Sequence, residues 1–65
     1  MFEINQSLIR ATMCEKQMTV RETARRANMS ETTLRTLLND KATANARTVG
    51  RLAAALDVKP SEILK

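Results

Sequence analysis

Two short helical segments, residues 20–27 and 31–38, constrain the fold most strongly, because only three residues separate them. A connection this short does not allow the two helices to lie antiparallel, so they must cross steeply. Leu34 and Leu37 mark the inward side of the second segment. The spacing therefore predicts a helix-turn-helix.

The residues at the ends of these segments support the same assignment. Thr19 and Glu22 form a capping-box pattern, in which each side chain satisfies a backbone N–H group at the helix start. Asn28 tolerates the left-handed conformation that ends a helix. Ser30 is a favourable N-cap for the second segment.

Three further helices are expected around this pair. Asn5 can cap a first helix that ends near residue 16 or 17, and Pro60 suits the first position of a very short fifth helix. Asn45 can cap a fourth helix, whose one-face apolar stripe consists of Val49, Leu52, Ala53 and Leu56. Strand signals are weak, and only residues 1–4, MFEI, suggest an extended start. Residues 39–45 are predicted to be a polar loop. We therefore expect one compact all-α domain of five helices over residues 1–65.

The composition excludes several kinds of site. The chain has 65 residues, one cysteine and no histidine, so neither an internal disulfide nor a zinc site is expected. Cys14 is expected to be a buried or half-buried small hydrophobic residue. Nothing in the sequence provides a catalytic base, so we expect no enzymatic activity, no metal and no cofactor.

The charge balance suggests a polyanionic partner. Eleven Lys and Arg residues against seven Asp and Glu residues give a formal net charge of +4, which favours nucleic acid, although a merely solvated basic surface is the alternative. Phe2 is the only aromatic residue, which argues against single-strand and RNA binding. No apolar run approaches the roughly 20 residues of a membrane span, and the start does not have the pattern of a signal peptide. A free cysteine without an export signal is typical of a cytoplasmic protein.

The spacing of small and apolar residues in the two short helices resembles the helix-turn-helix signature of the phage repressor and Cro family, also called the xenobiotic-response-element family. The residues that carry it are Ala24, Asn28, Met29, Leu34 and Leu37. The resemblance extends over nearly the whole chain, through Ile9, Met18, Asn39, Lys41, Asn45, Val49, Leu52, Ala53, Leu56, Val58 and Ile63. One departure is Val20, where the family often has a glutamine that braces a phosphate contact.

This resemblance implies a lambda-repressor-like domain and a function. We expect a sequence-specific regulator of transcription that binds double-stranded DNA, and more narrowly a small repressor encoded by a bacterium, phage or mobile element. A homodimer would bind a pseudo-palindromic operator, with residues 31–38 of each copy in the major groove. No small-molecule ligand is expected.

Candidate base-reading residues follow from the helical period. With Leu34 and Leu37 inward, the outward side chains are Glu31, Thr32, Arg35 and Thr36, and the family's base readers fall at the same positions. Arginine can donate two hydrogen bonds to guanine, threonine can contact a thymine methyl group, and glutamate can accept from cytosine.

Candidate phosphate contacts flank this helix. The N-terminal ends of the second and fourth helices offer backbone N–H groups to an anion. The residues expected to contact phosphates are Arg10, Thr19, Arg21, Thr33, Asn39, Lys41, Thr43 and Arg47. The last four resemble the family's backbone clamp. Thr33 lies nearer the rim of the reading helix.

Glu31 leaves a second function open, because phosphates repel a carboxylate on the reading face. It reads cytosine, pairs with Arg35 one turn later, or marks a surface that meets protein. In the last case the chain is a protein-interaction module, such as an antitoxin or adaptor, that reuses the fold.

Overall fold

Each of the four α-helices begins at a polar residue whose side chain accepts a hydrogen bond from the backbone N–H three residues later. A computed structural model describes residues 1–40 and 43–65 and contains α1 (Gln6–Glu15), α2 (Val20–Arg26), α3 (Glu31–Asn39) and α4 (Ala46–Leu56). The capping bonds are Asn5 to Leu8 (3.0 Å), Thr19 to Glu22 (3.0 Å), Ser30 to Thr33 (3.0 Å) and Asn45 to Thr48 (2.8 Å). All four predicted N-caps are therefore confirmed.

The residues that follow α1, α2 and α4 include one each in the left-handed conformation. These are Gln17, Asn28 and Asp57, with φ angles of 55°, 58° and 57°. The prediction for Asn28 is thus confirmed. The Glu22 carboxylate accepts a hydrogen bond from Arg26 at 2.9 Å rather than from the start of α2, so only the first half of the predicted capping box forms.

A small antiparallel sheet corrects the prediction of an all-α chain. β1 (Phe2–Glu3) pairs with β2 (Thr43–Ala44), with Phe2 opposite Ala44. Residues 43 and 44 therefore form a strand inside the segment that was predicted to be a polar loop. Strands of two residues are too short to show an alternating pattern. The extended start expected at residues 1–4 contains β1, whereas nothing in the sequence predicts β2.

The predicted fifth helix is a 3-10 helix, η1 (Pro60–Ile63), so the count of five α-helices is wrong. Pro60 takes the first position, as predicted. The chain then extends beside the N-terminal segment, where the N–H of Asn5 donates to the Ile63 carbonyl at 2.7 Å and the N–H of Lys65 donates to the Glu3 carbonyl at 3.0 Å. These two bonds stop the last turn from continuing as an α-helix.

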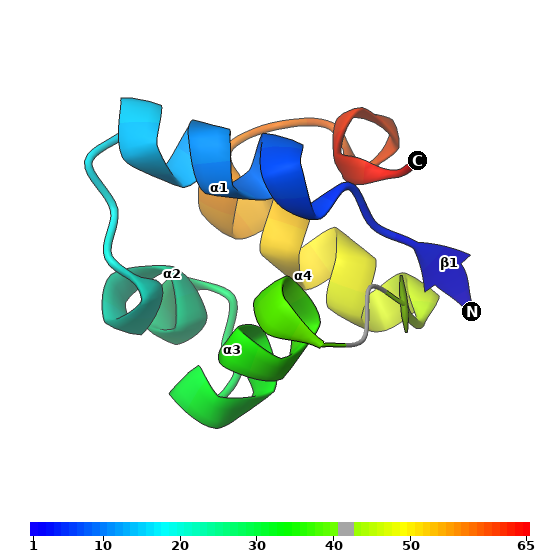
Figure 1. The fold of residues 1–65 in the computed structure, drawn as a ribbon, viewed down its shortest axis with the longest axis horizontal. Coiled ribbons are helices and arrows are strands. Elements are labelled where there is room, and N and C mark those ends of the chain that lie inside the picture. The colour runs from blue at the N-terminus through cyan, green and yellow to red at the C-terminus, as the bar shows by residue number, and fades with distance from the viewer. Residues whose placement is uncertain (41–42) are drawn as a thin grey trace.

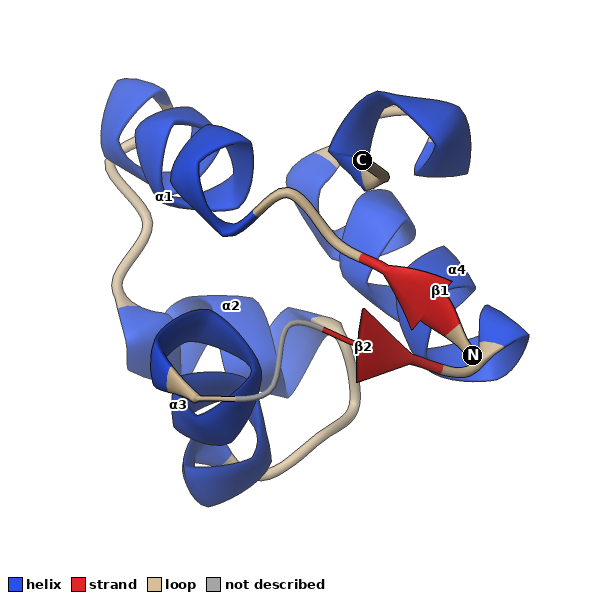
Figure 2. Ribbon diagram, turned by 45° about the vertical axis from the view of Figure 1, so that its right-hand side comes forward, coloured by secondary structure: helices blue, strands red, loops and turns tan. Residues whose placement is uncertain are grey.

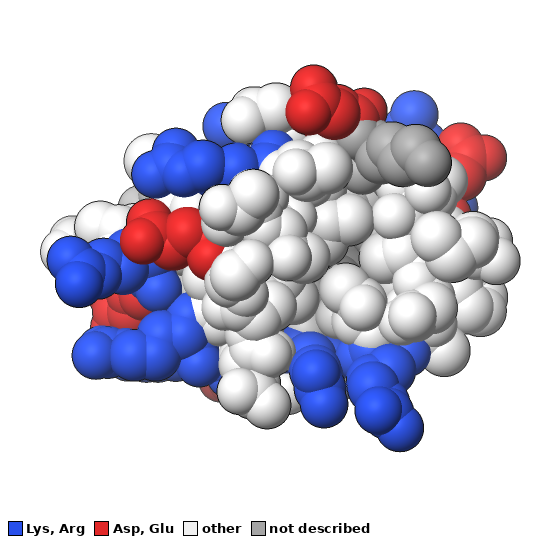
Figure 3. Space-filling model, turned by 90° about the horizontal axis from the view of Figure 1, so that it is seen from below, with Lys and Arg blue, Asp and Glu red and all other residues white. Residues whose placement is uncertain are grey.

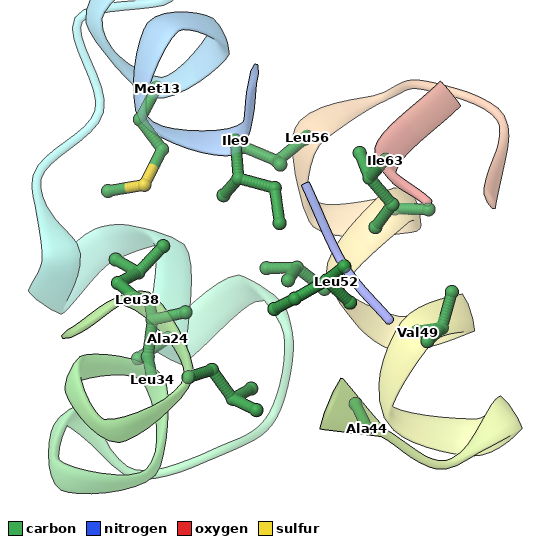
Figure 4. Close-up of a cluster of buried hydrophobic side chains, with 13 residues drawn as sticks. Ile9, Met13, Ala24, Leu34, Leu38, Ala44, Val49, Leu52, Leu56 and Ile63 are labelled. Atoms are coloured by element: carbon green, nitrogen blue, oxygen red, sulfur yellow. The ribbon is translucent and has the colours of Figure 1, made fainter. Parts of the chain in front are cut away.

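The core collects apolar side chains from every α-helix and from η1 (Figure 4). Its large, fully buried members are Ile4, Ile9, Leu34, Leu52, Leu56 and Ile63. Thr23 is also fully buried, and its hydroxyl donates to the Thr19 carbonyl at 2.8 Å. Cys14 is exposed, which contradicts the expectation of burial, because the neighbouring Met13 takes the inward position on α1.

The arrangement of the helices leaves α3 at one edge of the molecule (Figure 1). In that view α1 lies along the top, α4 runs through the middle, and α2 and α3 lie below. Both chain termini lie at the right-hand end, beside β1 and η1 (Figures 1 and 2). Thus α3 has one side against the core and the other on the lower surface.

Candidate nucleic-acid interface

The two sides of α3 differ in the way that the sequence predicts. Leu34, Leu37 and Leu38 are buried against the core. The predicted base readers are all exposed: Glu31, Thr32, Arg35 and Thr36. The structure therefore brings these four polar side chains together on one accessible face, which we call the reading face.

Two interactions within α3 orient the polar side chains of the reading face. The Thr36 hydroxyl donates to the Thr32 carbonyl at 2.9 Å, so its oxygen remains available as an acceptor. The Glu31 carboxylate lies 3.6 Å from the Arg35 guanidinium, an ion pair between exposed groups one turn apart. Such pairs contribute little to stability, so the guanidinium can turn to another acceptor at small cost.

The C-terminal end of α3 is held by two side chains of α1. Gln6 donates its amide N–H to the Leu37 carbonyl at 2.7 Å, and Arg10 donates to the Leu38 carbonyl at 3.2 Å. Arg10 also donates to the side-chain oxygen of Asn39. Since the last carbonyls of a helix have no partner within it, these bonds both satisfy α3 and fix its position on α1.

Arg10 thus has a role that sequence reasoning missed. It was predicted only as a phosphate contact, whereas its side chain here binds the end of α3. Asn39, also predicted to contact phosphate, is its partner. Their phosphate contacts stay predictions. The bonds join residues about 28 positions apart, so no local pattern in the sequence reveals them.

The other predicted phosphate contacts lie on several elements around α3. Thr19 and Arg21 are exposed at the start of α2, and Arg47 is exposed in the first turn of α4. Thr33 shares a 2.8 Å hydrogen bond with Ser30, while Thr43 is half-buried in β2. Lys41 lies outside the described residues. Val20 packs against the core, so the glutamine position of the family is apolar here.

Positive charge is concentrated around α3. Seven of the 11 Lys and Arg residues but only three of the seven Asp and Glu residues lie between residues 19 and 51, so this segment carries the entire formal net charge of +4. Figure 3 shows the molecule from the lower side, where basic side chains lie mainly along the left and lower edges of a mostly uncharged surface, with some acidic side chains at the left and the top. This distribution suits a polyanion that spans the α3 side of the molecule.

A groove between α2 and the start of α3 adds Arg25 to this surface. Arg21, Arg25 and Ser30 line it together with Ala24, Asn28, Met29 and Glu31. Arg25 is not among the residues predicted to contact phosphates. Its position four residues after Arg21 on α2 was the available signal, because residues at that spacing share a helix face.

The comparison with protein families agrees with this geometry. A family model described as the Cro/C1-type HTH DNA-binding domain matches residues 9–65. The chain belongs to this family. No curated protein and no solved structure matches it.

Because it belongs to the Cro/C1-type family, the chain is a DNA-binding regulator. The match also confirms the resemblance that the helix-turn-helix residues indicated. The match begins at Ile9, so β1 and the first turn of α1 lie outside the matched range. In the described parts of the chain, no helix is long and apolar enough to cross a membrane.

The anchoring of α3 by α1 leads to a prediction about stability. Arg10→Ala removes both bonds to the end of α3 and should lower the free energy of unfolding by about 1 kcal/mol. Arg51→Ala removes the same charge from an exposed position on α4 and should change it by less than about 0.5 kcal/mol. Urea unfolding of both variants measures the difference. Equal losses would show that Arg10 does not hold α3.

Proposed function

We propose that this protein is a sequence-specific repressor that places α3 in the major groove of double-stranded DNA. The observation that carries the proposal is the reading face. Its four exposed polar side chains project from α3, whose C-terminal end is held by Gln6 and Arg10 of α1. The helix also lies within residues 19–51, the segment that carries the net positive charge. A helix-turn-helix protein contacts base edges with the N-terminal part of such a helix.

Each group on the reading face has a distinct part in the proposal. Arg35 donates two hydrogen bonds to guanine O6 and N7. Glu31 either keeps its ion pair and braces the guanidinium, or is released when Arg35 turns away and accepts from a neighbouring cytosine amino group. Thr36, whose hydroxyl hydrogen is already used by the Thr32 carbonyl, offers its oxygen as an acceptor and its methyl group to thymine.

The proposed phosphate contacts give affinity and register. They are Arg47 and Thr43 on one flank and Thr19 and Arg21 on the other, together with Arg10, Thr33, Asn39 and Lys41. Such contacts orient the protein but carry no sequence information of their own. Two copies bound to half-sites about one helical turn apart would read a pseudo-palindromic operator. By occupying it they would exclude other proteins from the site.

A salt titration tests DNA binding against the protein-interaction alternative. Fluorescence anisotropy with a labelled random-sequence duplex should show binding at low salt, and the affinity should fall by about tenfold or more between about 50 and 200 mM salt, because phosphate contacts release counterions. Undetectable binding at low salt, or an affinity that does not change with salt, would favour the protein-interaction module instead.

A pair of arginine variants tests which residue contacts the bases and which contacts the phosphates. On the site selected from a random duplex pool, Arg35→Ala should cost about 1–3 kcal/mol of binding and relax one base position. Arg47→Ala should weaken all sequences alike and lower the salt slope by about 1. Binding measured on cognate and single-substitution duplexes separates the two. The assignment is wrong if both variants lose the same affinity on every sequence.

A further inference from the structure

An apolar hollow lies at the end of the molecule that carries both termini. Its volume is about 250 Å³, and we call it the terminal hollow. It is lined by Phe2, Ala46, Val49, Gly50, Pro60 and Leu64. Phe2, the only aromatic residue of the chain, is 47% exposed at its edge instead of buried in the core. Figure 2 turns this end, with β1, β2 and the start of α4, toward the reader.

We infer that a second copy of this chain covers the terminal hollow when two copies bind DNA. The inference deepens the proposed function, on which it rests, by assigning the surface through which the two copies meet. The sequence alone does not show which surface this is. Of the apolar residues near the two termini, Ile4, Leu56 and Ile63 are fully buried in the core, and Val58 and Leu64 are partly buried against it. Met1 and Phe2 are exposed.

The position of the hollow relative to α3 suits two adjacent half-sites. The long axis of the molecule measures 27 Å, and the middle of α3 lies in the half that is farther from the termini (Figure 1). Two copies joined end to end at the terminal hollow would therefore hold their α3 helices on the order of one molecular length apart. The 27 Å long axis is of the same order as the ~34 Å that separates half-sites one turn apart.

Dimers formed through other surfaces would not present both reading faces correctly to one DNA duplex. Contact through the outer side of α1, at the top of Figure 1, would point the two α3 helices in opposite directions, so one duplex could not meet both. Contact through the α2 end would bring the α3 helices closer together than contact through the terminal hollow. It would also bring together Arg21, Arg25 and Arg26 of both copies, which repel.

The charges around the terminal hollow are mixed. Residues 1–18 and 52–65 together carry four basic and four acidic side chains, so this part of the chain has no formal net charge. The exposed charged residues next to the lining residues are Glu3, Arg47, Arg51, Lys59 and Lys65. Two copies related by a two-fold axis can meet here when Glu3 of one copy faces a basic group of the other.

Gly50 gives the hollow room for close approach. It lies in the middle of α4, where glycine is less favourable than alanine. A Cβ atom added at Gly50 would meet nothing within 4 Å among the described residues, so packing in this part of the chain does not require a glycine. Contact with a second copy would account for it.

The size of the hollow predicts a weak dimer, which is detectable without DNA only at high protein concentration and is favoured on the operator. A stable interface buries roughly 800 Å² of each partner, about a fifth of the 4289 Å² that the chain exposes. Six lining residues provide only part of that area. Binding to two adjacent half-sites raises the effective concentration of each copy for the other, so the contact should appear as cooperative binding.

Two variants and one control test the surface. Phe2→Glu places a charge at the hollow, and Leu8→Glu places the same charge at a comparably exposed leucine, 39% exposed, on α1. On a duplex with two half-sites, Phe2→Glu should raise the half-saturation concentration by about tenfold or more, and Leu8→Glu should not. On a duplex with one half-site, both should bind like the parent protein.

Gly50→Ala separates dimerisation from folding. It should raise the melting temperature, because alanine favours the helix, and should still reduce cooperativity, because its methyl group enters the contact. The inference is overturned if the parent protein fills two half-sites independently, if Phe2→Glu keeps full cooperativity, or if Leu8→Glu loses as much.

If the proposed function itself is wrong, the result will be different: the parent protein will not bind the duplex with one half-site. In that case sedimentation equilibrium without DNA, at the highest soluble concentration, decides on the surface. Self-association that Phe2→Glu weakens and Leu8→Glu does not would support it. A monomer at every concentration, or equal association of both variants, would contradict it.

Discussion

The short turn between α2 and α3 determines where the reading face lies. Asn28 adopts the left-handed conformation, the N–H of Met29 donates to the Ala24 carbonyl at 2.9 Å, and Ser30 caps the next helix. These local bonds fix the direction in which α3 leaves the turn. Gln6 and Arg10 then fix its other end. A nine-residue helix held at both ends keeps its outward side chains in place although few contacts cover them.

The features that were predictable from the sequence are those set by neighbouring residues. A capping side chain acts three residues away and an apolar stripe repeats every turn, so Asn5, Thr19, Ser30 and Asn45 mark the helix starts correctly. The small sheet, the 3-10 form of η1 and the exposure of Cys14 depend on contacts between distant segments or on competition between adjacent side chains. Local patterns do not contain that information.

The same distinction applies to the candidate interface. Helical periodicity was enough to find the four side chains of the reading face, because burial of Leu34 and Leu37 leaves only one outward side. It was not enough to find that Arg10 supports α3 or that Arg25 lines the groove with Arg21. A basic residue looks the same in the sequence whether it faces a phosphate or a helix end. Only the packing of α1 against α3 distinguishes the two.

The central claim is that the reading face of α3 meets the DNA. The most direct measurement is a ¹H–¹⁵N NMR titration of the protein with a duplex that contains one half-site. We expect the largest amide shift changes in α3 around Thr32, Arg35 and Thr36, with smaller changes at the starts of α2 and α4. The largest changes at β1, η1 or the outer side of α1, with α3 unaffected, would contradict it.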